Sequence, residues 1–286
     1  MFTVTENLQM RPMTKKDLPF AMRLHHIEHW NQLEPDWEFL MDADAGGNYV
    51  AVYNGKDAGT VTTFTYQDRF CWIGMVLVDP EYRGLGIGSA LLNASIAFGK
   101  NKGTIRLDAT PQGKKLYETL GFKTERTLGR YELKNLKDLP PPAQKCSPVT
   151  ADVLKEIIGL DSTAFGAERE NVLHYLLDTA PQYAYYLEKK GKITGYCFGR
   201  PGTAAHQIGP LIAENTADAK TLLLNALQSC PSSVILDVFE ENSEWIEELK
   251  SLKFEYERPF IRMYLGELKH PGNIEMQYAI AGPEIG

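Results

Sequence analysis

The sequence has 286 residues, a formal net charge of -7 and 43% hydrophobic residues, a composition typical of a folded protein with room for two domains. Its acidic balance argues against a broad surface for nucleic acid or anionic membranes, although a local cationic pocket is compatible with it. The start, MFTVTENLQMRPM, has no basic segment followed by an apolar core, and no apolar run approaches about 18 residues. We therefore expect a cytoplasmic protein with neither a nucleic-acid nor a membrane partner.

The first half begins with a predicted helix and a hairpin. Residues 13–30 predict the helix, because Thr14 stands in an N-cap position with Asp17 three residues later and apolar residues follow at helical spacing. Residues 48–66 predict two strands joined at "NG" or at "DAG".

A strand, a glycine-rich loop and a second helix follow. Residues 70–78 form a long apolar run ended by Pro80, which predicts a buried strand. From Gly86 the apolar residues recur at helical spacing until "GKNKG" stops them. A strand at 104–109, a short helix around 114–122 and a last strand at 127–134 complete the half. This order predicts a mixed α/β architecture, an α+β mixed sheet with helices packed on it.

The second half weakly repeats the first. "LLNA" at 91–94 returns at 223–226, and "LGFKTERTLGRYEL" at 120–133 parallels "LKFEYERPFIRMYL" at 252–265, in both cases at an offset of 132. Between the halves runs a charged, proline-rich stretch without apolar periodicity. We therefore predict a first domain over residues 1–135, a linker over 136–147 and a second domain over 148–286.

The four cysteines are scattered along the chain without a CxxC pair. This spacing predicts neither a zinc knuckle nor a disulfide framework. Reduced, mostly buried thiols are the expectation.

The loop "RGLGIGS" at 83–89 has the composition of an anion site. The first amides of a helix have no partner within the helix, and glycines let a diphosphate approach the backbone without clashes with Cβ atoms. Arg83 adds a planar cation suited to phosphate oxygens. A Walker P-loop would need a lysine after the third glycine, and the GxGxxG fingerprint would need a glycine in place of Ser89. Both of those readings therefore fail.

The pattern that fits is Arg-x-x-Gly-x-Gly after an extended strand, at Arg83, Gly86 and Gly88. It resembles the pyrophosphate loop of the GNAT superfamily of N-acetyltransferases, and "LYETLGF" at 116–122 resembles a second pattern of that family. The resemblance implies two GNAT-like domains in tandem, each a twisted mixed sheet flanked by helices, and acetyl-coenzyme A as the cosubstrate. It places acetyl-coenzyme A on Val76, Leu77, Val78, Arg83, Gly84, Leu85, Gly86, Ile87, Gly88 and Ser89.

The same resemblance supplies candidate catalytic groups. It implies that Tyr117 protonates the departing thiolate, with plain packing as the alternative, and that the amide of Val76 or a neighbour binds the developing oxyanion. Asp108 is the candidate base by position, although it could equally cap the following turn. The segment "DATPQGKKLY" is shorter than its family counterpart and lacks an asparagine found there, which weakens the carry-over to Asp108. Glu28, Glu34 and Asp36, in the first helix and the loop expected after it, are further candidates for the base.

The first helix and the segment after it are expected to line the acceptor site. Glu28, Trp30 and Trp37 are the candidate acceptor-binding residues. His25 and His29 stand four residues apart, but there is no HExxH arrangement and no evident third ligand. We therefore expect no metal ion.

The second half lacks the residues of the loop. At the offset of 132, Asn215 takes the place of Arg83 and Asp218 that of Gly86, and residues 210–253 contain neither glycine nor arginine. Because carboxylates repel a diphosphate, we expect no coenzyme there. The second domain would instead line the acceptor cleft or stabilise the first.

The sequence thus predicts an acyltransferase that moves an acetyl group from acetyl-coenzyme A directly to a primary amine of a small molecule or peptide. The alternative is a non-catalytic sensor of coenzyme A or acyl-coenzyme A. The acceptor and the oligomeric state stay open, a homodimer included.

Overall fold

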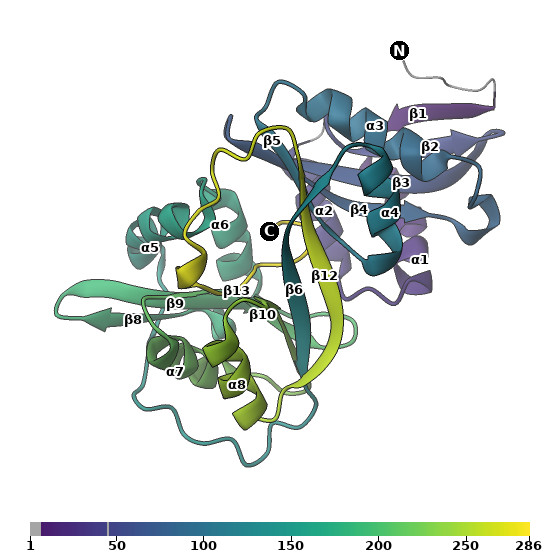
Figure 1. The fold of residues 1–286 in the computed structure, drawn as a ribbon. Helices are drawn as coiled ribbons and strands as arrows, with labels where there is room; N and C mark the ends of the chain where they lie inside the picture. The colour runs from purple at the N-terminus through teal and green to yellow at the C-terminus, as the bar shows by residue number, and fades with distance from the viewer. Residues whose placement is uncertain (1–6, 45) are drawn as a thin grey trace. The chain divides into compact units, whose positions relative to one another are not determined.

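The structure is a computed structural model that describes residues 7–44 and 46–286, and it divides into two compact units (Figure 1). The first unit runs to Thr124 and includes Met263–Lys269 and Ile285, and the second comprises Glu125–Arg262, His270–Glu284 and Gly286. No helix within the described ranges has both the length and the apolar character needed to cross a membrane. Three of the four cysteines are buried, in agreement with the expectation of mostly buried thiols.

The first unit is a mixed sheet with helices on both faces. Its strands lie in the order β1-β2-β3-β4-β5, in which β4 and β5 are parallel and the other neighbours antiparallel. The elements wholly within this unit are β1 (Leu8–Pro12), the 3-10 turn η1 (Lys15–Asp17), α1 (Leu18–Ile27), α2 (Glu34–Ala43), β2 (Tyr49–Tyr53), β3 (Lys56–Tyr66), β4 (Phe70–Val78), the 3-10 turn η2 (Pro80–Tyr82), α3 (Ile87–Gly99), β5 (Thr104–Ala109) and α4 (Pro111–Thr119).

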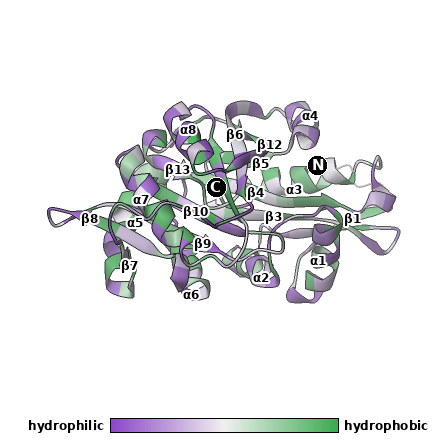
Figure 2. Ribbon diagram, turned by 90° about the horizontal axis from the view of Figure 1, so that it is seen from below, coloured by the Kyte–Doolittle hydropathy of each residue, from purple (hydrophilic) through white to green (hydrophobic). Residues whose placement is uncertain are grey.

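The alternation of side chains along β3 shows which helices cover which face. A Cβ on Gly59 would meet Leu91 of α3 at 3.0 Å, whereas the ring of Phe64 packs on Phe39 of α2, with ring centroids 5.7 Å apart. Residues an odd number apart on a strand point to opposite faces. Helix α3, drawn largely in the green of hydrophobic residues in Figure 2, therefore covers one face, and α2 covers the other together with α1.

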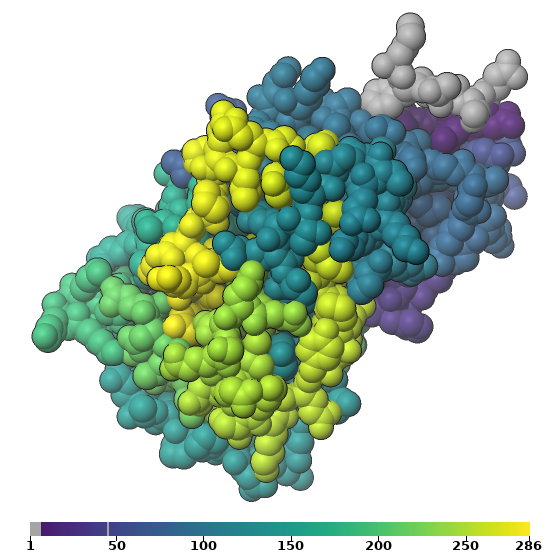
Figure 3. Space-filling view, in the orientation of Figure 1, coloured from purple at the N-terminus to yellow at the C-terminus, as the bar shows by residue number. Residues whose placement is uncertain are grey.

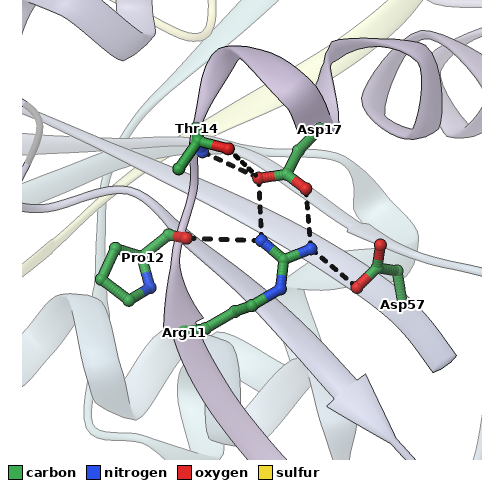
Figure 4. Close-up of polar contacts among 5 residues, drawn as sticks. All are labelled: Arg11, Pro12, Thr14, Asp17 and Asp57. Atoms are coloured by element: carbon green, nitrogen blue, oxygen red, sulfur yellow. Dashed lines mark hydrogen bonds and ion pairs between the residues drawn. The ribbon is translucent and has the colours of Figure 1, made fainter. Parts of the chain in front are cut away.

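The start of α1 is fixed by a cluster of charges (Figure 4). Thr14 caps η1, as predicted, and its amide donates to Asp17 Oδ2 at 2.8 Å. Arg11 of β1 grips both carboxylate oxygens of Asp17 at 2.7 and 2.8 Å and reaches Asp57 of β3 at 2.8 Å. Burial alone would raise the pKa of Asp17, but the bonds from Arg11 and Thr14 outweigh it and lower that pKa. The cluster thereby ties β1, η1 and β3 together.

Most sequence predictions for the first half are confirmed. The buried strand, the helix after the glycine loop and the strand at 104–109 are β4, α3 and β5, and the hairpin turns at Asn54 and Gly55, with φ of 50° and 76°. The expected loop after the first helix is wrong, because Glu34–Ala43 form α2. That helix starts where the Asp36 carboxylate accepts the Leu33 amide at 2.6 Å.

The second unit repeats the mixed sheet, with strands in the order β6-β11-β10-β9-β8-β7. Strands β10 and β11 are parallel, and β13 pairs antiparallel with β10. The elements wholly within this unit are β7 (Ser147–Pro148), α5 (Ala151–Phe165), α6 (Glu170–Thr179), η3 (Pro181–Tyr183), β8 (Tyr185–Lys189), β9 (Lys192–Arg200), β10 (His206–Ala213), α7 (Thr216–Leu227), β11 (Val234–Phe239), α8 (Ser243–Ser251), η4 (Ile274–Met276) and β13 (Gln277–Ala279).

Two long strands pass from one unit to the other. Strand β6 (Lys123–Leu133) ends the first half of the chain, yet from Glu125 it belongs to the second unit, where it pairs antiparallel with β11. Strand β12 (Glu255–Leu265) lies beside β6 in the strand order and returns to the first unit at Met263 (Figure 1). Residues 266–269 after it also belong to the first unit, and the Thr104 hydroxyl donates to the Glu267 carbonyl there. Figure 3 draws this C-terminal part of the chain in yellow. The sequence repeat and the compact units thus divide the chain at different places.

Candidate active site

Strand β4 carries a bulge near its C-terminal end. Met75 and Val76 stand opposite the single residue Val61 of β3, and Met75 has a φ of 52°, which is uncommon for a residue with a side chain. The hydroxyl of Thr60 donates to the Met75 carbonyl at 3.0 Å. The bulge is therefore fixed by a buried hydrogen bond, and Val76, the predicted oxyanion donor, lies in it.

Strands β4 and β5 are paired only at their starts. Their register joins Phe70–Trp72 to Thr104–Arg106, while β4 continues to Val78 and β5 to Ala109. Beyond Trp72 the register gives β4 no partner residue on β5. The part of β4 that contains the bulge is therefore not paired with β5.

Six consecutive amides in the loop and the first turn of α3 have no partner. On either side, Arg83 N–H donates to the Pro80 carbonyl at 3.4 Å and Ala90 N–H donates to the Gly86 carbonyl at 3.1 Å. The amides of residues 84–89 donate to no acceptor in the described part of the chain. Helix starts of this kind attract anions, because the free N–H groups and the helix dipole both present positive charge.

Two of the glycines hold this loop in a conformation that side chains disfavour. Gly84 and Gly86 have φ of 80° and 78°, in the left-handed region, and Gly86 is the N-cap of α3. A Cβ at either position would meet no atom within 4 Å. The backbone is therefore open to a ligand at both positions. Of the predicted coenzyme residues, Val76–Val78 end β4, Arg83–Gly86 form the loop, and Ile87–Ser89 open α3.

The loop arginine and the strand end are both tied to α1. Arg83 donates from Nη2 to Glu28, the C-cap residue of α1, and from Nε to the Val78 carbonyl at 3.3 Å. Arg23 of α1 donates to Asp79 Oδ2 at 2.5 Å. Burial alone would raise the pKa of Asp79, but Arg23, a backbone amide and the charge of Arg83 outweigh it and lower that pKa. Sequence reasoning missed both ion pairs, since their partners stand 55 and 56 residues apart.

Tyr117 lies on α4, next to the first turn of α3. Thr110 caps α4 by accepting the Gly113 amide at 3.2 Å, and a Cβ on Gly88 of α3 would lie 3.3 Å from Leu116. The Tyr117 ring is half-buried and packs edge-on against Phe122, with ring centroids 6.0 Å apart. Burial raises the pKa of Tyr117 to about 12, so its hydroxyl keeps its proton at neutral pH.

Asp108 is half-buried on β5, on the face that α1 and α2 cover. Ile105 packs beside Gly99 of α3, and Asp108, three residues further along the strand, points to the opposite face. Thr110, two residues further along, is the N-cap of the following helix α4.

The candidate acceptor-binding residues differ in how far they are buried. Glu28 pairs with Arg83, Trp30 is half-buried, and Trp37 lies fully buried in α2. The indole N–H of Trp37 has no partner within the described ranges. Glu34 and Asp36, the further base candidates, lie in the first turn of α2, and the Asp36 carboxylate is used to cap it.

His25 and His29 do not share a helix face. Helix α1 ends at Ile27, and His29 lies beyond it, exposed and with a φ of 54°. His25 is fully buried, and burial, with a smaller effect of His26, lowers its pKa to about 4. In the described part of the chain, His, Cys, Asp and Glu side chains form no group of three that could hold a metal ion.

In the second unit, side chains of the protein itself bond at the start of α7, the helix that corresponds to α3. Asn215 caps α7 by accepting the Asp218 amide at 3.0 Å, and Asp218 also accepts Lys189 Nζ at 2.5 Å. Lys220 is held by Glu248 of α8 at 2.5 Å. A carboxylate therefore lies at the start of α7, whereas the start of α3 has the unpartnered amides of residues 84–89. Tyr278 and Glu284 in the tail are buried in the second unit, where Glu284 pairs with Arg200.

Two family models and several known proteins match this chain in sequence. A model described as the acetyltransferase (GNAT) family matches residues 8–122, and one described as an acetyltransferase (GNAT) domain matches residues 157–279. Holothin acyltransferase of Pseudoalteromonas is 27% identical over 265 residues, which cover 91% of this chain and 88% of that protein. YitH of Bacillus subtilis, described as an uncharacterized N-acetyltransferase, is 26% identical over 187 residues, 65% of this chain and 66% of its own.

Solved structures agree on the fold. A structure from Pyrococcus horikoshii, described as that of a putative acetyltransferase, superposes with a TM-score of 0.82 at 24% identity, covering 98% of this chain and 96% of that one. A tandem GNAT protein from the clavulanic acid biosynthesis pathway gives a TM-score of 0.64 at 13% identity, covering 90% and 98%. With the two family models and the repeated mixed sheet, the conclusion is that this chain belongs to the GNAT acetyltransferase superfamily and carries two GNAT domains in tandem.

Proposed function

We propose that the first domain transfers an acetyl group from acetyl-coenzyme A directly to a primary amine. The observation that carries this proposal is the run of six unpartnered amides at residues 84–89, beside the permanent cation of Arg83. A diphosphate can accept several of these N–H groups at once, and the open backbone at Gly84 and Gly86 admits it without a clash. Acetyl-coenzyme A supplies the acyl group as a thioester.

The end of β4 is the proposed place for the thioester carbonyl. An amide at the bulge, that of Val76 or a neighbour, would donate to the oxygen as negative charge develops on it. Such a donor is most effective when it is held in place before the reaction. The Thr60 bond to the Met75 carbonyl fixes the bulge and so supports this role.

Tyr117 is the proposed donor to the sulfur when the carbon–sulfur bond breaks. Its pKa of about 12 lies above that of an ordinary thiol, about 8.5, so complete proton transfer from the resting phenol would be uphill. A hydrogen bond to the developing thiolate still lowers the barrier, and solvent can complete the protonation. Asp108 is the proposed acceptor of the proton that the ammonium group of the substrate loses before the resulting neutral amine attacks the thioester carbonyl.

The relatives support acyl transfer as the type of reaction. One relative that spans nearly the whole chain is named as an acyltransferase acting on holothin, which favours catalysis over mere coenzyme sensing. The amine itself is left open, and a small-molecule or peptide amine fits equally well.

A panel of amines tests the proposal. Acetyl-coenzyme A is mixed with a peptide bearing a free α-amine, lysine, a polyamine, an amino sugar and an amino acid, and release of free thiol is followed. We expect one class to raise thiol release above the rate without amine, and Asp108→Asn to lower it. Stabilisation by acetyl-coenzyme A without turnover of any amine would favour the sensor instead. No shift in melting temperature with the coenzyme would remove both functions.

A further inference from the structure

The carboxylate of Glu28 lies on the guanidinium of the coenzyme-loop arginine. Glu28 ends α1, and its Oε1 accepts a hydrogen bond from Arg83 Nη2. The two side chains are 31% and 47% exposed, so water or a ligand can reach both. Because a diphosphate seated on the loop amides would also bond Arg83, the two anions would meet at one guanidinium.

A second ion pair, between Arg23 of α1 and Asp79, also attaches α1 to the end of β4. A ligand bound to the loop amides would leave this pair intact. Arg23 binds Asp79, which is buried at the end of β4 and also accepts the Glu81 amide at 3.0 Å. Asp79 lies before the loop and offers no free donor to an anion. The middle of α1 is thus anchored independently, and the Glu28 end is attached to the loop by a bond that an anion can replace.

The sign of the effect follows from charge alone. If the Glu28–Arg83 pair persists when the loop is filled, the carboxylate neutralises part of the arginine charge and repels the diphosphate. If the pair breaks, its free energy is lost on binding. In both cases Glu28 weakens coenzyme binding, whereas a residue that only positioned Arg83 would strengthen it.

We infer that Glu28 is a built-in competitor of the coenzyme diphosphate for Arg83, so that filling the loop releases the C-terminal end of α1. The inference rests on the proposed function, because it takes coenzyme A as the ligand of the loop. Coupling between two ligands is reciprocal. A cation that binds the freed Glu28 carboxylate therefore favours coenzyme binding in turn, which points to an acceptor that arrives as an ammonium ion.

The first test is the affinity for coenzyme A, measured by calorimetry at low ionic strength. Glu28→Gln should bind coenzyme A about two- to fivefold more tightly than the wild type, the range expected from an exposed ion pair. Asp42→Asn is the matched control, because Asp42 pairs with Lys15 at 2.9 Å and its side chain is 61% exposed. It removes the same charge without touching Arg83, and its affinity should equal that of the wild type. An equal gain in both variants would overturn the inference.

A double-mutant cycle separates competition for Arg83 from simple repulsion. In an Arg83→Gln background, Glu28→Gln should give no gain. A gain of the same size there would mean that Glu28 acts on the diphosphate directly, and the inference would fail. Weaker binding by Glu28→Gln alone would make Glu28 a positioning residue and would also overturn it. Absence of coenzyme binding by the wild type would instead refute the proposed function.

Hydrogen exchange gives a readout that a structural role would not produce. On adding coenzyme A to the wild type, amides of residues 84–89 should become protected, while those at the end of α1, residues 26–30, should exchange faster. Uniform protection of both segments would contradict the release of α1.

Discussion

Replacing Gly86 with alanine tests the anion site through the backbone alone. Gly86 is the N-cap of α3, with a φ of 78° and a ψ of 5°. A Cβ there would meet no atom within 4 Å, so the substitution adds no clash. What it adds is the cost of holding an alanine in the left-handed region, about 1–2 kcal/mol.

That cost should appear in coenzyme affinity rather than in folding stability. The loop is exposed at residues 83–86, and its amides bond nothing in the described protein, so an alanine can relax to a negative φ in the free protein. Binding must then restore the left-handed conformation, because only this conformation aims the amides at the anion. A loss of about 1–2 kcal/mol corresponds to about 5- to 30-fold weaker binding of coenzyme A.

Gly55 offers a matched control in the same unit. It has a φ of 76°, and a Cβ there would also meet no atom within 4 Å. Strand register holds its turn, with Tyr53 paired to Lys56, so the turn cannot relax freely. Gly55→Ala should therefore lower the free energy of unfolding by about 1–2 kcal/mol and leave coenzyme affinity unchanged.

Calorimetric titration with coenzyme A and urea unfolding of both variants provide the comparison. We expect Gly86→Ala to lose coenzyme A affinity but not folding stability, and Gly55→Ala to lose folding stability but not coenzyme A affinity. Unchanged affinity in Gly86→Ala would show that the left-handed loop does not hold the ligand, and the reasoning from the free amides would be refuted.

Three further outcomes are expected. Tyr117→Phe should lower the rate of thiol release by about 100-fold or more with coenzyme affinity unchanged, whereas Tyr49→Phe, which removes a hydroxyl bonded to Gly46 at 2.9 Å, should change neither; an unaffected rate in Tyr117→Phe would remove the acid role. His25 has a folded pKa of about 4, below its ordinary value of about 6.5, so the unfolded chain binds the extra proton between these values and stability falls as pH drops from about 6.5 to about 4. Urea unfolding should show a loss of about 2 kcal/mol between pH 7 and pH 5 that His25→Phe lacks, and an equal loss in that variant would contradict the assignment. Calorimetry should give a stoichiometry of one coenzyme A per chain. A second site of similar affinity would show that the second domain also binds the coenzyme.

The elements that were predicted from the sequence are those with local causes. Strand β4 is an apolar run ended by a proline, and α3 begins where glycines allow a left-handed N-cap. Helix α2 has a local signal too, since Trp37, Leu40 and Met41 are buried at helical spacing. That signal is short, because the apolar spacing extends over only one turn, and Phe39 on the other side of the turn weakens the contrast that marks a helix.

What could not be predicted depends on distant partners. A sequence with alternating side chains predicts that β6 is a strand, but it does not say which neighbour the strand takes. In the structure, Arg130 of β6 grips both oxygens of Asp237 of β11 at 2.8 Å, and both side chains are buried. Because the arginine and the aspartate are 107 residues apart, no local sequence pattern indicates that they pair. The attachment of α1 to the loop through Glu28 escaped prediction for the same reason.

The contrast between the two helix starts explains why a degenerate repeat can keep its fold. Free N–H groups at the start of a helix need partners, from side chains, water or a ligand. At α7, Asn215 supplies one within the chain, and an N-cap of this kind is worth about 0.5–2 kcal/mol. At α3 the N-cap is a glycine, which has no side chain to accept such a bond, so the first domain forgoes that stabilisation and leaves its amides open. The missing N-cap costs the first domain little if a bound anion accepts the amides of α3 instead. The second domain needs no such anion to be stable, because Asn215 caps α7 while the mixed sheet stays the same.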